Sequence, residues 1–144
     1  MAASAQVNLS YPKPRDSLEK VIKIVRTDTT AFVGAWLPKD AVITGLYVIG
    51  AAASDAASSA TIGIGSTSSA NEYLASYDVK TAATGEGYNP AGAAAVGSAM
   101  MSKLTADVSV YAKYAETGTA STTGGPWYVK IEYSVVGSGE DIQM

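Results

Sequence analysis

The strongest constraint on the fold is an alternation of apolar and polar residues near the end of the chain. In residues 127–136, WYVKIEYSVV, one set of alternate side chains is apolar, and the set between them carries Lys130 and Glu132. A period of two indicates a strand with one face in a core and the other in water. We therefore expect the core-facing side chains to be Trp127, Val129, Ile131 and Tyr133.

A second alternating segment precedes this one. Residues 106–115, ADVSVYAKYA, place Val108, Val110, Ala112 and Tyr114 on one face. The segment between them, ETGTASTTGGP at 116–126, is rich in turn-forming residues. The two segments together predict an antiparallel hairpin that closes the chain.

Five more segments complete the expected secondary structure. Val, Ile and aromatic residues favour strands, and they are dense in 20–27, 31–37 and 41–50, with a shorter strand expected at 61–65. Residues 70–79 are compatible with a short helix that groups Tyr73, Leu74 and Tyr77 on one side.

Strict alternation also assigns faces within two of these strands. In 31–37 it places Phe32, Gly34 and Trp36 together. In 41–50 it places Val42, Leu46 and Val48 on one face. The other face carries Ala41, Ile43, Tyr47 and Ile49. Because both faces are apolar, we expect this strand to be buried on both sides, in the core or at a subunit interface.

Six or seven short strands with little helix predict an all-β fold, an antiparallel β-sandwich of jelly-roll type. We expect a single sandwich domain over residues 18–137 and a polar C-terminal tail over 138–144. Pro12 and Pro14 favour an extended N-terminal arm over residues 1–17. This arm is either a frayed terminus or a docking segment that uses Tyr11. Residues 81–102 form a long connection of small residues with no clear partner inside one domain.

The composition argues against most catalytic and ligand-binding classes. The chain has no cysteine and no histidine, so thiol chemistry, disulfides and the commonest general base are excluded. The net charge of −3, with scattered basic residues, does not suggest a nucleic-acid partner. The pair Gly63-x-Gly65 lacks the third glycine of a dinucleotide loop, because residue 68 is Ser, and close packing against another segment explains it better. The apolar stretch 41–53 is too short to span a membrane.

Three segments carry a resemblance to a known family. They are LPKDAVITGLYVIGA, TIGIGSTSSANEYLASYDVKTAATGEG and DVSVYAKYAETGTASTTGGPWYVKIEYSVVG. Their order resembles the capsid decoration (cement) proteins of tailed bacteriophages, which have a jelly-roll-like sandwich. The resemblance covers roughly residues 20–137.

The resemblance implies a structural protein of the virion, made in the host cytoplasm, with no enzymatic activity, cofactor or metal. It implies that the protein binds the outside of an assembled shell, with the major capsid protein and further copies of itself, as a dimer or trimer, for partners. We expect capsid or subunit contacts at Tyr11, Pro12, Pro14, Tyr47 and Tyr88. The alternative is a head-fibre or tail-associated module that binds host-surface carbohydrate, which predicts exposed aromatic residues near carboxylates or amides.

Overall fold

The computed structural model describes residues 18–50, 52–80 and 102–136. These residues form seven strands and no helix. The strands are β2 (Leu18–Ile24), β3 (Phe32–Leu37), β4 (Ala41–Gly50), β5 (Ser59–Gly65), β6 (Leu74–Asp78), β7 (Val108–Thr117) and β8 (Trp127–Val135).

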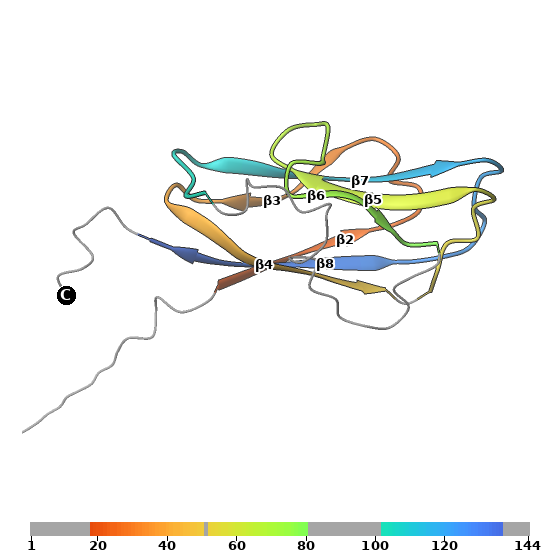
Figure 1. Cartoon of the computed structure of the whole chain (residues 1–144), viewed down its shortest axis with the longest axis horizontal. Helices are drawn as coiled ribbons and strands as arrows, with labels where there is room; N and C mark the ends of the chain where they lie inside the picture. The colour runs from red at the N-terminus through yellow and green to blue at the C-terminus, as the bar shows by residue number, and fades with distance from the viewer. Residues whose placement is uncertain (1–17, 51, 81–101, 137–144) are drawn as a thin grey trace, which may run out of the picture.

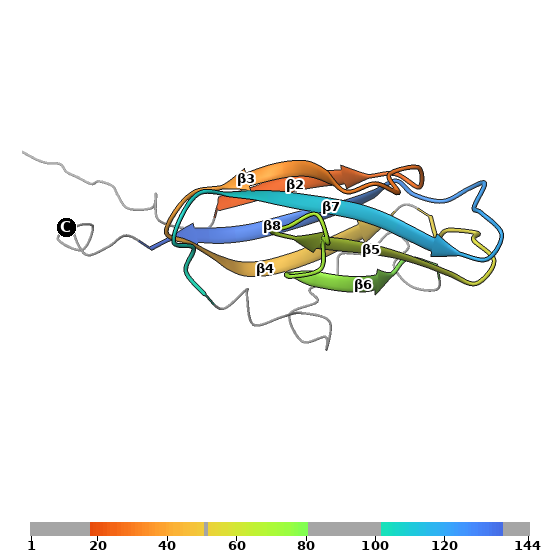
Figure 2. The same cartoon turned by 90° about the horizontal axis from the view of Figure 1, so that it is seen from above.

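The strands build two antiparallel sheets that pack face to face (Figures 1 and 2). One sheet has the order β2-β8-β4, and the other has the order β3-β7-β5-β6. The chain changes sheet after β2, β3, β4 and β7, as in a jelly roll, in which most neighbours in a sheet are not consecutive in sequence. The predicted all-β antiparallel sandwich is confirmed, whereas the extended arm lies outside the described residues.

The predicted closing hairpin is wrong, because β7 and β8 lie in different sheets. β7 pairs with β3 and β5, and β8 pairs with β2 and β4. Alternation identifies which face of a strand is buried but not which strand lies beside it. The apolar faces of β7 and β8 meet across the core, where the rings of Tyr114 and Trp127 stack at 5.4 Å between centroids and 8° between planes.

The predicted core face of β8 is confirmed. Trp127, Val129 and Ile131 are fully buried and Tyr133 nearly so. They join residues from every other strand in one apolar cluster. β2 begins at Leu18, two residues earlier than expected, because it pairs along β8 as far as Tyr133.

A β-bulge in β3 makes the face assignment for residues 31–37 wrong. The register with β7 shifts between Val33 and Ala35. Phe32, Ala35 and Leu37 therefore contact the core, and Trp36 is exposed. The extra residue is Gly34, at which a Cβ atom would collide with the Ile22 side chain.

A second bulge, in β4, changes which side chains of this strand face the core, so the expected face assignment for 41–50 is wrong. The register with β8 shifts between Ile43 and Gly45, so one extra residue on β4 reverses the alternation beyond it. Ile43 and Leu46 consequently share the core face with Val48, whereas Ile49 is exposed. Only one face of this strand is buried within the described part of the chain, and burial of the other face at a subunit interface stays a prediction.

The expected helix at 70–79 is a strand instead. β6 pairs with β5 through Thr61–Asp78, Ile62–Tyr77 and Ile64–Leu74. Tyr73 and Leu74 are buried and Tyr77 packs against the core. These three side chains therefore do contribute to the core, but from a strand and the residue before it and not from a helix. Pairing with the edge of β5 outweighs the weak helical preference of this short segment.

Polar contacts tie the loops together at one end of the sandwich. Asp55 Oδ1 accepts hydrogen bonds from the backbone N–H groups of Thr122 (2.8 Å) and Thr123 (2.9 Å), and Oδ2 accepts one from the Thr122 hydroxyl (2.8 Å). These hydrogen bonds, the one from Thr123 N–H foremost, hold the pKa of Asp55 well below its usual range. The loop after β4 is thereby fastened to the loop before β8.

Truncation of the β8 core face tests the register. Ile131→Ala should lower the free energy of unfolding by about 2–5 kcal/mol, because it leaves a cavity between the sheets. Ser134→Ala, on the opposite face of the same strand, should change it by less than about 0.5 kcal/mol. Urea unfolding of both variants measures the difference, and similar costs would contradict the assigned faces.

Acid should weaken the Asp55 contact. A carboxylate whose pKa is depressed by folding contributes stability above its unfolded pKa of about 3.9, and this contribution is lost as the pH falls below that value. Asp55→Asn should therefore melt below the wild type at pH 7, and the gap between the two melting temperatures should shrink towards pH 2. A gap that stays constant from pH 7 to pH 2 would show that the charge of Asp55 contributes nothing.

Candidate interaction surface

The outer face of the three-stranded sheet carries an ordered mixture of charged, aromatic and aliphatic side chains. The strand register places Val21, Lys130 and Tyr47 in one row across β2, β8 and β4. The neighbouring row is Lys23, Tyr128 and Ile49. Because the alternate residues of β8 are buried in the core, these two rows point away from the other sheet.

Lys130 is at the centre of this face. Its Nζ lies 3.2 Å from Glu132 Oε2 and 3.6 Å from Glu19 Oε1. It also lies 5.2 Å from the centroid of the Tyr47 ring, in cation–π range. The hydrogen bond to Glu132 is the main cause that raises the pKa of Lys130 above its ordinary value. One lysine thus links all three strands and is fully charged at neutral pH.

Apolar side chains surround this charged centre. Val21 is 55% exposed and Ile49 is 41% exposed, whereas Tyr47 and Tyr128 are half-buried. We call the set Glu19, Val21, Tyr47, Ile49, Tyr128, Lys130 and Glu132 the Lys130 face. Further exposed apolar side chains lie at one end of the same sheet: Leu18, Val135 and Val136. Apolar side chains around a charge that is already paired are well suited to burial against another protein.

The Lys130 face contains one of the five residues expected at an interface. Tyr47 lies beside Lys130 on this face, whereas Tyr11, Pro12, Pro14 and Tyr88 lie outside the described residues. Sequence reasoning missed Lys130 and Val21. Alternation does predict that Lys130 is exposed, but its proximity to Glu19 and Tyr47 follows only from the order of the three strands.

An open hollow lies beside the exposed Trp36. It has a volume of about 360 Å³ and is lined by Lys20, Trp36, Leu37, Pro38, Asp107 and Tyr133. Trp36 is 60% exposed. Asp107 Oδ1 accepts a hydrogen bond of 2.9 Å from the backbone N–H of Lys39. We call this site the Trp36 hollow; it places an aromatic ring near a carboxylate and an ammonium group.

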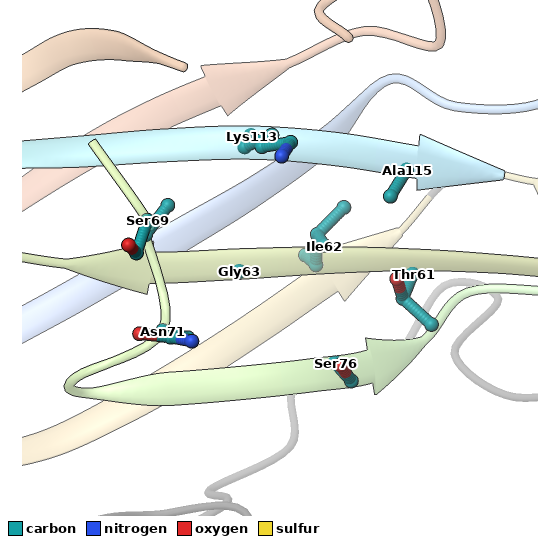
Figure 3. A pocket seen from close by; sticks show the side chains of 9 residues that line it. Thr61, Ile62, Gly63, Ser69, Asn71, Ser76, Lys113 and Ala115 are labelled. Atoms are coloured by element: carbon teal, nitrogen blue, oxygen red, sulfur yellow. The ribbon is translucent and has the colours of Figure 1, made fainter. Parts of the chain in front are cut away.

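A smaller hollow of about 140 Å³ lies over β5, between β6 and β7 (Figure 3). The loop that carries Ser69 and Asn71 crosses β5 at its arrowhead in this view, beside Gly63. A Cβ atom on Gly63 would collide with the Ala70 carbonyl oxygen, and one on Gly65 with Glu72. The interpretation of Gly63-x-Gly65 as a place of close packing is therefore confirmed.

Glu72 holds this crossing loop in place. Its carboxylate accepts hydrogen bonds from Ser66 N–H (2.9 Å) and Thr67 N–H (3.3 Å), and from the Thr67 hydroxyl. Partial burial acts to raise the pKa of Glu72, but these hydrogen bonds outweigh it and lower the pKa. The hollow is thus the space between this fixed loop and the sheet beneath it.

The part of the chain that the structure describes holds neither a cluster of metal-binding carboxylates nor a membrane-spanning helix. Within residues 18–50, 52–80 and 102–136, no group of three or more Asp and Glu residues is placed to hold a metal ion. In the same ranges, no helix is long and apolar enough to cross a membrane.

Substitution at Gly63 tests the crossing loop. Gly63→Ala should lower the free energy of unfolding by about 1–3 kcal/mol, because the added methyl group meets backbone that has no room to move. Gly45→Ala is the matched control, since its nearest neighbour is the movable Tyr47 ring at 3.1 Å. Equal melting temperatures for Gly63→Ala and the wild type would show that the loop does not cross β5 closely.

Comparison with known proteins identifies a shared fold. No protein-family model and no curated protein sequence matches the chain. Among solved structures, the chain is similar to a chain of the "Cyanophage Pam1 capsid asymmetric unit". The two are 18% identical, the match covers 94% of this chain and 98% of that chain, and the TM-score is 0.50. At this identity the likeness shows that the two chains share a fold over nearly their whole lengths.

Proposed function

We propose that this protein is a structural component of a phage virion. It binds the outer surface of the capsid and stabilises the expanded shell by bridging capsid subunits. The observation that carries the proposal is the shared fold with a chain of a phage capsid unit, which extends over almost the full length of both chains. Its partners are the major capsid protein and further copies of itself, as a dimer or trimer, and it has no catalytic role.

The Lys130 face is the proposed contact with the shell. The ammonium group of Lys130, at its centre, is already paired with the carboxylates of Glu19 and Glu132, so Lys130 keeps its ion-pair partners when the face is buried. Val21 and Ile49 supply exposed apolar area, and Tyr47 and Tyr128 supply aromatic rings of the kind that dominate interface energies. A twisted sheet with the second sheet behind it keeps this area rigid, which lowers the entropic cost of binding.

Stabilisation of the shell follows from selective binding. A protein that binds the expanded state and not its precursor shifts the equilibrium towards the expanded state. At a free concentration one hundred times the dissociation constant, each site contributes about 2.7 kcal/mol. Many sites on one shell multiply this effect, and the arm over residues 1–17 is proposed to add contact area on a neighbouring subunit.

The Trp36 hollow favours a second candidate function. An exposed indole ring beside Asp107 and Lys20 offers a stacking surface and hydrogen-bonding groups to a sugar. On this alternative, the protein is a head-fibre or tail-associated module that binds a host-surface carbohydrate. The two candidates use different surfaces, so single substitutions separate them.

A charge placed on the Lys130 face tests the first candidate. Val21→Lys replaces an exposed apolar side chain with a second ammonium group next to Lys130 and should weaken co-sedimentation with expanded capsids at least about tenfold, which corresponds to about 1.4 kcal/mol. Val33→Lys is the matched control, because Val33 is 43% exposed on β3 in the other sheet. It should bind as the wild type does.

Trp36→Ala tests whether the Trp36 hollow, and not the Lys130 face, contacts the capsid. Normal capsid binding by this variant, together with loss in Val21→Lys, supports attachment through the Lys130 face. Loss of binding in Trp36→Ala alone would move the contact to the Trp36 hollow, and glycan binding that depends on Trp36 would favour the second candidate. Equal binding by wild type and Val21→Lys would contradict the proposed surface, provided that melting temperatures show all variants folded.

A further inference from the structure

One edge of the three-stranded sheet has no neighbouring strand among the residues that the structure describes. In the order β2-β8-β4, no described strand pairs with the outer side of β4. This strand has ten residues, AVITGLYVIG, with no charge and no proline. Proteins protect such edges with charges, proline or a covering segment, because exposed backbone groups recruit other strands. β2, at the opposite edge, carries Glu19, Lys20 and Lys23.

The chain on either side of residues 81–101 is fixed at the two ends of β4. Val79 accepts a hydrogen bond of 2.9 Å from the backbone N–H of Ser54, shortly beyond the end of β4. At the other end, Asp40 N–H donates to Leu104 O (2.8 Å), and Leu104 N–H donates to Ala41 O (2.9 Å). Lys103 Nζ lies 3.6 Å from Asp40 Oδ1. The described residues that flank 81–101 therefore lie near opposite ends of β4.

The intervening sequence has the right length to run back along β4. β4 spans about 33 Å at about 3.3 Å per residue. Residues 91–101, AGAAAVGSAMM, carry no charge and no proline, and their extended length matches that of β4. Residues 81–90, TAATGEGYNP, hold the glycines, the asparagine and the proline typical of a turn.

We propose that residues 91–101 pair with β4 of the same chain as an additional antiparallel strand. The three-stranded sheet then has four strands, as the facing sheet does, and the sandwich has the eight strands of a jelly roll. The uncharged edge of β4 is covered, and the surface next to the Lys130 face is extended by small side chains. The inference is independent of the proposed function, because it rests only on the edge, its two fixed ends and the sequence between them.

Disulfide scanning tests the pairing in a chain that has no cysteine of its own. An antiparallel register continued from Leu104 opposite Asp40 or Ala41 places residue 95 or 96 opposite Ile49. Ile49→Cys is therefore combined, one at a time, with cysteine at residues 95–98. A strand directs alternate side chains to opposite faces, so disulfide formation should be several-fold higher at one pair of alternate positions than at the other.

Val21→Cys is the matched control, since Val21 is an exposed residue on β2 at the other edge of the same sheet. Combined with the same four cysteines, it should form no internal disulfide. Uniform cross-linking along residues 95–98, equal yields with Val21→Cys, or no cross-linking would overturn the proposal. Disulfides found only between two molecules would overturn it as well, since they would show that β4 pairs with a second copy.

Hydrogen exchange on the unmodified protein provides a test that needs no substitution. Peptides from residues 91–101 should exchange much more slowly than peptides from residues 138–144, because half of a strand's amides are hydrogen-bonded to its neighbour. Exchange as fast in residues 91–101 as in the tail would contradict the additional strand, whatever the cross-linking result.

Discussion

The stacked rings of Trp127 and Tyr114 join the two central strands of the sandwich across its core. Trp127 begins β8, and Tyr114 lies near the end of β7, so the stack connects the middle of one sheet to the middle of the other. The Tyr114 hydroxyl forms a 2.7 Å hydrogen bond with Ser54 and donates a 2.8 Å hydrogen bond to Glu116. The hydroxyl group of Tyr114 thereby also links the loop that holds Ser54 to the end of β7.

The two bulges decide which side chains the sandwich presents outside. The extra residue at Gly34 places Trp36 on the outer side of β3, together with Val33. The register shift before Gly45 places Tyr47 on the outer side of β4, next to Lys130. Bulges reverse the alternation of a strand at little cost and are common where a strand must redirect a side chain. The Lys130 face and the Trp36 hollow both depend on this local geometry.

Much of the sandwich was predictable because alternation is a local property. The core faces of β7 and β8 follow from residues 106–115 and 127–136, and the small size of Gly63 predicted a close approach. The pairing of strands and the bulges were not predictable, because they depend on contacts between segments far apart in sequence. Tyr47 was expected at an interface on grounds of its apolar strand, but the role of Lys130 required knowledge that β2, β8 and β4 are neighbours.

In the proposed function, the three-stranded sheet attaches the protein to the shell through a paired lysine surrounded by apolar side chains. This sheet, and not the four-stranded one, is the proposed contact with the capsid. A cryo-electron microscopy map of the expanded capsid with the protein bound measures this directly. We expect density for the major capsid protein against Val21, Tyr47 and Tyr128. A map in which these side chains face solvent while Val33 or Trp36 contacts the shell would contradict it.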